Sequence, residues 1–345
     1  MTGGGMSAVV WAGVNDVRVE EVSLPEVPPG WALVRVACTG ICGTDLGIVR
    51  GKHPRARRGL ILGHEISGWV EVTAPGGPPE GTLVVAEPLI SCGECRACRE
   101  GHSHVCARLG LFGIDAPGGA AQFVALPPSV LHQVPAGVEP TQAALTEPLA
   151  VAVHAVRRSG MEAGDVVAVF GAGPMGILTA LVARHEGASH VVVAEPNARR
   201  RAVVSDMGLI AVPDGAQLRD TVAELSQGDG ADTTFDSAAH PAVAAELADV
   251  TRVLGRVVIV GVYKEPAAVD LQAVCFKEQS VVGVRVYTRE DVRTAIDLIA
   301  HNALGLDRIP VSVYGFDRIS DAFDAAATGS DGLKVLLSTH REAVS

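Results

Sequence analysis

The sequence is poor in aromatic residues, which make up 4% of its 345 positions, although hydrophobic residues as a whole make up 48%. Its cores must therefore be built mainly from Val, Ala and Leu. No apolar run reaches the roughly 18 residues that a membrane-spanning helix requires. The first residues also lack the basic and then apolar segments of a signal peptide. We therefore expect a soluble protein of the cytoplasm.

Positive charge is also scarce, because the net charge at pH 7 is −11. An acidic chain repels the phosphates of nucleic acids and of anionic membranes, so neither is expected as a partner. A small-molecule substrate is expected instead. No stretch is repetitive enough to indicate disorder. A chain of this length is too long for one ordinary domain and suits two.

Cysteine is rare, yet four of the seven cysteines lie in "SCGECRACREGHSHVC", residues 91–106. Disulfides are not expected in a reducing compartment. The spacing C-x2-C-x2-C-x7-C lets four thiolates converge on one ion, and four sulfurs leave no open position, which predicts a structural zinc. An iron–sulfur cluster is the alternative for such spacing. His102 and His104 could replace a cysteine but are expected to be loop residues. The predicted ligands are Cys92, Cys95, Cys98 and Cys106.

The pattern of predicted elements changes near residue 148. Before it, short strand-like runs alternate with turn residues, which predicts an irregular antiparallel barrel. After it, the strand-like runs "VVAVF", "HVVVAE", "TTFDSA" and "RVVIVG" alternate with helical patterns, which predicts a parallel sheet with helices on both faces. The helical patterns cover 174–187, 198–208 and 241–255. The C-terminal part predicts helices over 289–304 and 315–329 and a strand over 333–338.

A dinucleotide fingerprint, G-x-G-x-x-G, lies between a predicted strand and a predicted helix at Gly171, Gly173 and Gly176. The first glycine permits the tight turn, the second lets the backbone approach a pyrophosphate, and the third lets the helix pack closely on the strand. The helix N-terminus then faces the phosphates. Pro174 and Met175 stand in this turn and are included in the predicted cofactor site.

The end of the next strand carries an acid, Glu195, at about the spacing expected for a ribose-binding carboxylate. Its carboxylate can bind both adenosine ribose hydroxyls and would repel a 2′-phosphate, which favours NAD over NADP. Three arginines argue for NADP instead, because they could bind a 2′-phosphate. They are Arg199, Arg200 and Arg201. The carboxylate is given more weight because it sits at the strand end, and Arg200 is expected beside the adenosine.

Three separate segments supply candidate ligands for a reactive metal. Cys42 lies in "GICGTDL", His64 and Glu65 lie in "LGHEISG", and Glu147 lies in "EPLAVAVHAV". A catalytic zinc needs about three protein ligands and one open position. Each residue taken alone has an ordinary explanation, since a lone cysteine in an apolar strand is usually core packing.

In this order along the chain, the segments resemble the zinc-dependent medium-chain alcohol dehydrogenases, most closely the polyol branch of sorbitol, butanediol and threonine dehydrogenases. The resemblance covers about residues 6–340. It implies an α/β protein with a GroES-like β-barrel catalytic domain at 1–149 and 289–345, which carries the zinc lobe at 91–107. It also implies a doubly wound Rossmann domain that binds NAD at 150–288, with the active site in the cleft between the domains.

The resemblance further implies roles for single residues at the reactive centre. Cys42 and His64 would bind the catalytic zinc together with Glu147, either directly or through water, and Glu65 would enter when water leaves. Asp45 would hold the far nitrogen of His64 and fix its tautomer.

Two further roles complete the site that the resemblance implies. Thr44 would bond the substrate hydroxyl and pass its proton on, and Lys334 would lie near the cofactor phosphates. Each chain would hold two zinc ions and one NAD, and the chains would form a homodimer or homotetramer. The expected reaction is hydride transfer between NAD and a secondary alcohol, such as a polyol, a vicinal diol or an amino alcohol.

Two other classes of function are weighed against this one. A zinc-free quinone or enoyl reductase of the same fold would lack the Cys42, His64 and Glu147 set. A non-enzymatic nucleotide-binding protein would have lost ligands or a broken glycine loop. Neither loss is present in the sequence.

Some residues depart from the family pattern, and others have no role in it. Gly47 stands where relatives often have a proton-relay histidine, so His53, or water and the cofactor ribose, would have to serve. The basic segment "KHPRARRG", residues 52–59, is either a site for an anionic substrate group or, as we favour here, a solvated loop or subunit contact. Cys38 and Cys275 are expected to pack in the core.

Overall fold

The structure, a computed structural model, describes residues 4–339 and divides the chain into two compact units. The first comprises residues 1–147, 288–302 and 309–345, and the second comprises 148–287 and 303–308. The division lies close to the expected domain boundaries, except that 303–308 belong to the second unit. The ends of the expected first domain, 1–3 and 340–345, lie outside the described residues. Which unit performs which role stays a prediction.

The first unit is built on β-sheets. Its main sheet has the strand order β10-β6-β5-β3-β18-β17, with β9 also paired to β3, and a smaller sheet has the order β2-β1-β4. The strands are β1 (Gly5–Gly13), β2 (Asp16–Ser23), β3 (Ala32–Gly40), β4 (Leu60–Ile61), β5 (Glu65–Val72), β6 (Leu83–Ala86), β7 (Leu89–Ile90), β8 (Gly110–Leu111), β9 (Phe123–Leu126), β10 (Leu131–Gln133), β17 (Val311–Gly315) and β18 (Lys334–Ser338).

Short helices connect these strands. They are α1 (Gly43–Val49), α2 (Arg96–Arg99), η1 (Ser103–Val105), η2 (Pro128–Val130), α3 (Pro140–Ala143), α10 (Arg289–Ala300), η4 (Phe316–Arg318) and α11 (Ile319–Thr328). The predicted helices over 289–304 and 315–329 correspond to α10 and to η4 followed by α11. α10 begins with a hydrogen bond from the backbone N–H of Asp291 to Oγ1 of Thr288, which is a typical N-cap.

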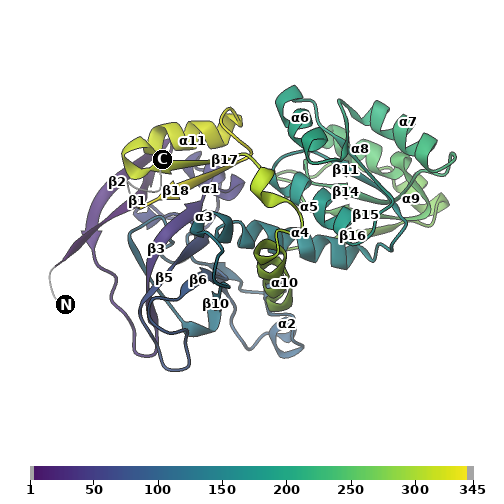
Figure 1. The fold of residues 1–345 in the computed structure, drawn as a ribbon. Coiled ribbons are helices and arrows are strands. Elements are labelled where there is room, and N and C mark those ends of the chain that lie inside the picture. The colour runs from purple at the N-terminus through teal and green to yellow at the C-terminus, as the bar shows by residue number, and fades with distance from the viewer. Residues whose placement is uncertain (1–3, 340–345) are drawn as a thin grey trace. The chain divides into compact units, whose positions relative to one another are not determined.

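The last strand of the chain pairs with one of the first. β18 runs antiparallel to β3, with Leu336 opposite Gly40 and Ser338 opposite Cys38. Figure 1 shows this as a yellow strand beside a purple one. The pairing brings Lys334, at the start of β18, to the turn that follows β3.

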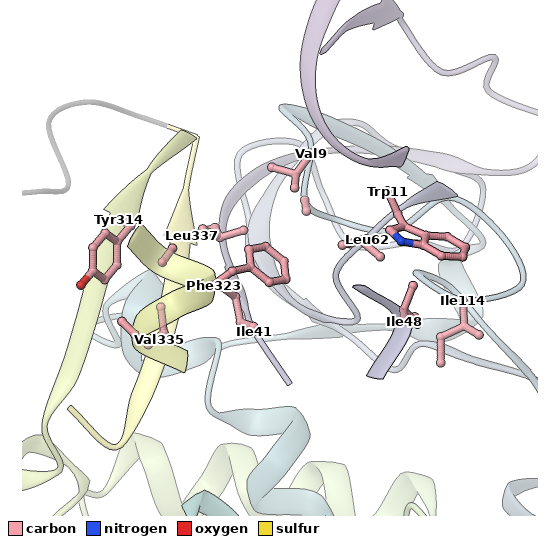
Figure 2. Packing of buried hydrophobic residues seen from close by; sticks show 13 residues of the cluster. Val9, Trp11, Ile41, Ile48, Leu62, Ile114, Tyr314, Phe323, Val335 and Leu337 are labelled. Atoms are coloured by element: carbon pink, nitrogen blue, oxygen red, sulfur yellow. The ribbon is translucent and has the colours of Figure 1, made fainter. Parts of the chain in front are cut away.

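An apolar cluster packs around the two segments that carry the first candidate ligands (Figure 2). Ile41 precedes Cys42, and Leu62 lies two residues before His64. Ile48 and Leu62 are almost fully buried. Removing a large buried aliphatic side chain costs about 2–5 kcal/mol, so this cluster fixes both segments firmly. The buried members of the cluster are Val9, Trp11, Ile41, Ile48, Leu62, Ile114, Ala120, Tyr314, Ala322, Phe323, Ala325, Val335 and Leu337.

The second unit is a parallel sheet with the strand order β13-β12-β11-β14-β15-β16, connected by helices. This confirms the predicted Rossmann-type half of the fold, as the antiparallel strands of the first unit confirm the other half. The elements are α4 (Thr146–Ser159), whose first two residues belong to the first unit, β11 (Val166–Phe170), α5 (Pro174–His185), β12 (His190–Ala194), α6 (Ala198–Asp206), β13 (Ile210–Val212), α7 (Gly215–Leu225), β14 (Ala231–Asp236), α8 (Pro241–Val250), β15 (Thr251–Ile259), α9 (Leu271–Phe276), β16 (Ser280–Gly283) and η3 (Leu306–Arg308).

The helix predicted over 241–255 is wrong in its second part, because α8 ends at Val250 and β15 begins at Thr251. The ammonium of Lys277 donates hydrogen bonds to the carbonyl oxygens of Ala248 and Thr251, each at 2.9 Å. This satisfies carbonyls that would otherwise be left unpaired at the helix end. The side chain comes from a segment about 25 residues further on, which helical periodicity cannot reveal.

The two cysteines that were expected in the core have different environments. Cys38 in β3 is buried, as predicted, and burial raises the pKa of its thiol to about 12. Cys275 in α9 is exposed, so that prediction is wrong. α9 is short and none of its residues is buried, which explains the difference. Within residues 4–339, no helix is both long and apolar enough to cross a membrane.

Candidate metal centres and cofactor site

Three candidate ligands from two segments of the first unit meet in one place. The ligand atoms of Cys42, His64 and Glu65 all lie within 4.8 Å of one another. His64 and Glu65 are buried, with 4% and 1% of their surfaces exposed, and Cys42 is half-buried. A thiol, an imidazole and a carboxylate at this spacing form a set that could hold one metal ion.

Local backbone structure explains how these side chains are held. Cys42 directly precedes α1, and its N–H donates to Oδ2 of Asp45 at 2.9 Å, which ties the helix start to the ligand. Gly63 has a φ of +92°, a conformation that favours glycine. A β-carbon there would lie 2.8 Å from the backbone nitrogen of Ala120, so only glycine permits this approach just before His64.

The imidazole of His64 lies beside a buried carboxylate. Nδ1 of His64 is 3.7 Å from Oδ1 of Asp45. Burial by itself lowers the pKa of His64, but the negative charges of Asp45, Cys42 and Glu147 together raise it well above its usual value. With Nδ1 turned toward Asp45, Nε2 is available for a metal, as the predicted role of Asp45 requires.

The carboxylate of Glu65 has a second partner that the sequence did not reveal. The ammonium of Lys334 lies 2.6 Å from Oε1 and 2.5 Å from Oε2 of Glu65, and it also donates to the carbonyl oxygen of Ile41 at 3.1 Å. Burial lowers the pKa of Lys334, but Glu65, Cys42 and Glu147 raise it above its usual value, so the lysine stays charged.

A glycine makes room for this ion pair. A β-carbon on Gly40, the last residue of β3, would lie 1.8 Å from Oε2 of Glu65 and 2.9 Å from Cε of Lys334. Any larger residue would therefore displace the pair. Lys334 was predicted to lie near the cofactor phosphates. In this structure its ammonium is directed at Glu65, so the cofactor role stays a prediction.

Two other predicted residues lie near the centre but outside the three-residue set. Glu147 stands in the first turn of α4, and its charge acts on His64 and Lys334. Its carboxylate does not belong to the group of mutually close ligands among residues 4–339. Thr44 is half-buried in α1, with Oγ1 at 3.9 Å from Sγ of Cys42.

The donor set suits zinc. Zinc in catalytic sites takes three protein ligands from sulfur, nitrogen and oxygen and keeps a fourth position open. Two buried atoms, Nδ1 of His64 and Oδ1 of Asp45, have no hydrogen-bond partner within the described residues. A metal on the other ring nitrogen would orient that ring and its proton toward the carboxylate.

The second centre is the lobe of four cysteines. Its sulfur–sulfur distances are 3.4 Å for Cys92 and Cys106, 3.5 Å for Cys95 and Cys98, and 3.9 Å for both Cys92–Cys98 and Cys95–Cys106. A tetrahedron with Zn–S bonds of about 2.3 Å has edges of about 3.8 Å. These distances fit a single ion, whereas a cluster would spread the sulfurs over more than one iron atom.

Neighbouring donors favour the thiolates of Cys92 and Cys95, whereas burial and then the Cys95 side chain raise the pKa of Cys98 to about 12. The N–H groups of Cys95 and Arg108 donate to the sulfurs of Cys92 and Cys106. The pKa of Cys92 is lowered to about 6, chiefly by a hydrogen bond from the Arg108 side chain and then by the N–H of Cys95. His104 lies in η1 and His102 directly precedes it, and neither belongs to the group of four.

The glycine loop of the second unit joins β11 to α5. Gly171 has a φ of +93°, and a β-carbon on Gly176 would lie 1.8 Å from the carbonyl oxygen of Gly171. A β-carbon on Gly173 would meet no atom within 4 Å, so that side of the loop is open. Pro174 and Met175 form the first turn of α5. This geometry suits a phosphate group at the helix N-terminus.

Glu195 follows β12 and is 5% exposed. Its Oε2 accepts the N–H of Ala172 at 2.8 Å, and its Oε1 accepts the N–H of Asn197 at 2.9 Å. Nη1 of Arg200 lies 4.0 Å from Oε2. The side chain of Arg201 binds the carbonyl oxygens of residues 195 and 196, so it is occupied by the backbone.

Sequence comparison identifies both parts of the chain. Residues 28–136 match the family described as Alcohol dehydrogenase GroES-like domain, and residues 174–301 match the family described as Zinc-binding dehydrogenase. A 2-dehydro-3-deoxy-L-galactonate 5-dehydrogenase of Pseudoalteromonas atlantica is 36% identical, over 98% of this chain and all of its own. An L-threonine 3-dehydrogenase of Pyrococcus abyssi is 33% identical, over 92% of this chain and 94% of its own.

Structural comparison agrees. A crystal structure of a zinc-binding dehydrogenase from Sinorhizobium meliloti, bound to NADP, superimposes with a TM-score of 0.89. It is 30% identical and covers 97% of this chain and 100% of its own. With its antiparallel barrel unit, its parallel nucleotide-type sheet and its two clusters of metal-ligating side chains, this chain belongs to the zinc-dependent medium-chain alcohol dehydrogenases, oxidoreductases that act on CH–OH groups.

Proposed function

We propose that this chain oxidises a secondary alcohol, of the class of polyols, vicinal diols and amino alcohols, with NAD as the hydride acceptor. The observation that carries the proposal is the meeting of Cys42, His64 and Glu65, whose ligand atoms lie within 4.8 Å of one another. A zinc ion bound by this set supplies a Lewis acid for the alcohol oxygen.

The side chains around this centre have distinct roles in the proposal. Asp45 holds the His64 ring through Nδ1 and balances its charge. The Oγ1 of Thr44 would accept a hydrogen bond from the substrate hydroxyl and pass its proton on through water or the cofactor ribose. Lys334 restrains the Glu65 carboxylate, and Glu147 adds a further oxygen ligand, directly or through water. The lobe of four cysteines holds a second zinc, which has no open position and stabilises the fold.

The coenzyme is proposed to be NAD, which accepts the hydride at its nicotinamide ring. Gly171, Gly173 and Gly176, with Pro174 and Met175 between the last two, hold its pyrophosphate. The buried carboxylate of Glu195 stands where a 2′-phosphate would meet repulsion, and Arg200 lies beside the adenosine. The solved relative from Sinorhizobium meliloti is bound to NADP, so membership of the family alone does not set the coenzyme, and we assign the preference to Glu195.

The test is an assay of reduced nicotinamide with secondary alcohols, diols, polyols and amino alcohols, combined with measurement of bound metal. We expect two zinc ions per chain and activity with at least one of these substrate classes. A chain without zinc that reduces quinones or enoyl compounds would contradict the proposal, as would a chain that binds NAD and catalyses nothing.

Glu195→Gln tests the coenzyme preference separately. Loss of the negative charge should raise kcat/KM with NADP relative to NAD by roughly tenfold, because repulsion of the 2′-phosphate is removed. Glu186→Gln, at the exposed end of α5, provides a matched control with the same change of charge. An unchanged ratio in Glu195→Gln would assign the preference to other residues.

The second unit also supports a homodimer. β16 stands at the edge of the parallel sheet, and its unpaired side can accept another strand. Val281 in this strand is 51% exposed, and Leu271 and Phe276 in α9 are 71% and 78% exposed. We propose that two copies pair through β16 and cover these side chains, as closed two-fold symmetry allows. Two such dimers could form a tetramer.

The assembly is tested by light scattering on the eluting protein. The wild type should have at least twice the mass of one chain, and Val281→Asp should shift it toward the monomer. If the wild type is a monomer, the proposed pairing through β16 is contradicted, but the proposed reaction is not. We further propose that the protein works in the cytoplasm, where reducing conditions keep the four thiols of the lobe available for zinc.

A further inference from the structure

A loop of the first unit, residues 51–59, joins α1 to β4 between the first two candidate ligands. Gly51 and Gly59 have φ values of +68° and +85°, so each end makes a glycine turn. The N–H of Lys52 donates to the carbonyl oxygen of Gly47 at 2.9 Å, and the N–H of Gly59 donates to that of Trp11 at 3.0 Å. The loop is therefore anchored at both ends.

Two of its arginines already contact other parts of the first unit. Arg55 donates from Nη1 to the carbonyl oxygen of Leu109 at 2.6 Å, and its Nη2 lies 3.2 Å from Asp115. Arg58 lies against β1, because a β-carbon on Gly13 would be 3.4 Å from its Nη2.

The other cations of the loop are free. Lys52 and Arg57 are exposed and form no ion pair within residues 4–339. The whole chain carries a net charge of −11. Two unpaired cations in the loop between the Cys42 and His64 segments therefore make a local positive field in an otherwise acidic protein, which attracts anions to this loop.

His53 is the half-buried residue of the loop that can donate a hydrogen bond. Its Nδ1 accepts the N–H of Arg55 at 3.4 Å, which leaves the proton of the neutral ring on Nε2. Burial and then Arg55 lower its pKa, His64 acts in the same direction, and Asp115 and Asp45 oppose them. The neutral ring therefore prevails at pH 7.

The surroundings of His53 connect it to the candidate centre. Asp45 and His64 both act electrostatically on His53, so it lies within range of the ligands. A β-carbon on Gly47, whose carbonyl holds the neighbouring Lys52, would meet no atom within 4 Å. This leaves room beside α1 for a group of the substrate.

We infer that His53 donates a hydrogen bond from Nε2 to the carboxylate of the substrate, while Lys52 and Arg57 attract that charge. This inference rests on the proposed function and narrows its substrate to a secondary alcohol that carries a carboxylate, either an amino acid or a sugar acid. A neutral diol or polyol could accept the N–H of His53 but would gain nothing from the unpaired cations. Nδ1 already accepts a hydrogen bond, which assigns His53 to binding and not to proton relay.

The test compares three substrates on the full chain loaded with zinc and NAD: L-threonine, 2-dehydro-3-deoxy-L-galactonate and 2R,3R-butanediol. His53→Ala and His53→Asn should lower kcat/KM for the carboxylate substrate about tenfold relative to the diol, mainly through KM, because a hydrogen bond to a charged group is lost. His53→Gln keeps an N–H donor near the position of Nε2. It should therefore retain most of the wild-type ratio of kcat/KM for the carboxylate substrate to kcat/KM for the diol. Arg58→Gln is the control from the same loop.

A binding measurement separates this inference from the proposed function. Isothermal titration of the zinc-loaded protein with L-threonine and with 2-dehydro-3-deoxy-L-galactonate identifies which acid is bound. If the wild type oxidises butanediol but neither binds nor oxidises the acids, the carboxylate site is overturned and the function stands. If the acids bind in a His53-dependent way but no alcohol is oxidised, the function fails and the site stands. If the His53 variants lose kcat/KM equally for all three substrates, the carboxylate site is also overturned.

Discussion

The two candidate metal centres differ in how much of the chain each one needs. The four cysteines of the lobe lie within 15 consecutive residues, and short backbone turns bring their sulfurs to distances of 3.4–3.9 Å. The Cys42–His64–Glu65 centre joins segments 22 residues apart and is backed by Lys334, which lies 269 residues from Glu65 in sequence. The lobe therefore depends on the spacing of its cysteines in the sequence, whereas the Cys42–His64–Glu65 centre depends on the pairing of distant strands.

The sharpest test of this contrast is Cys42→Ser. The variant should lose one of two zinc ions and at least ~10³-fold in kcat, because several kcal/mol of charge stabilisation at the alcohol oxygen is lost. Its melting temperature should change little, since the cluster around Ile48 and Leu62 stays packed. Metal analysis and steady-state kinetics measure the two effects. Retention of both zinc ions with full activity would contradict the assignment of this centre.

Cys92→Ser should show the opposite pattern. The lobe should lose its zinc and its order, since the binding free energy of such a site is folding free energy. We expect a fall in melting temperature of about 5–10 °C, while kcat per folded molecule stays within a few-fold of wild type. Calorimetry with metal analysis checks this. An unchanged melting temperature would show that the lobe does not support the rest of the first unit.

Lys334→Met tests whether the distant strand serves the catalytic centre. The variant leaves the buried Glu65 carboxylate unpaired, which costs about 3–5 kcal/mol in the free energy of unfolding. Adding Glu65→Gln should recover much of that stability, because the buried charge is then gone. Urea unfolding of both variants measures the difference. Gly40→Ala should act in the same direction, whereas Gly43→Ala, with open space at its β-carbon, is the control.

The smallest effect is expected from Arg108→Gln in the lobe. Arg108 lowers the pKa of Cys92 to about 6, so the thiolate is present at neutral pH and becomes protonated as the pH falls through that value. Without the arginine the pKa rises, and protons compete with zinc at a higher pH. The midpoint of acid-induced zinc release should shift upward by about one pH unit. A midpoint that does not move would leave the backbone N–H donors as the main cause.

The local features could be predicted from the sequence because their determinants are close in the chain. The glycine loop, the four-cysteine lobe, and the alternation of strands and helices are of this kind, and the family resemblance, confirmed by comparison, added Cys42 and His64. The Glu65–Lys334 pair could not be predicted, because it depends on the register of β18 against β3. The end of α8 was also missed, since Lys277 caps it from a later segment.

The pairing of β18 with β3 has a consequence for synthesis in the cell. Cys42, His64 and Glu65 are synthesised long before Lys334, which follows Glu65 by 269 residues. Until β18 has been made, the nascent Glu65 carboxylate lacks its ammonium partner. The Glu65 carboxylate can therefore be restrained only after β18 has paired with β3, and a chain that stops before β18 would lack this ion pair.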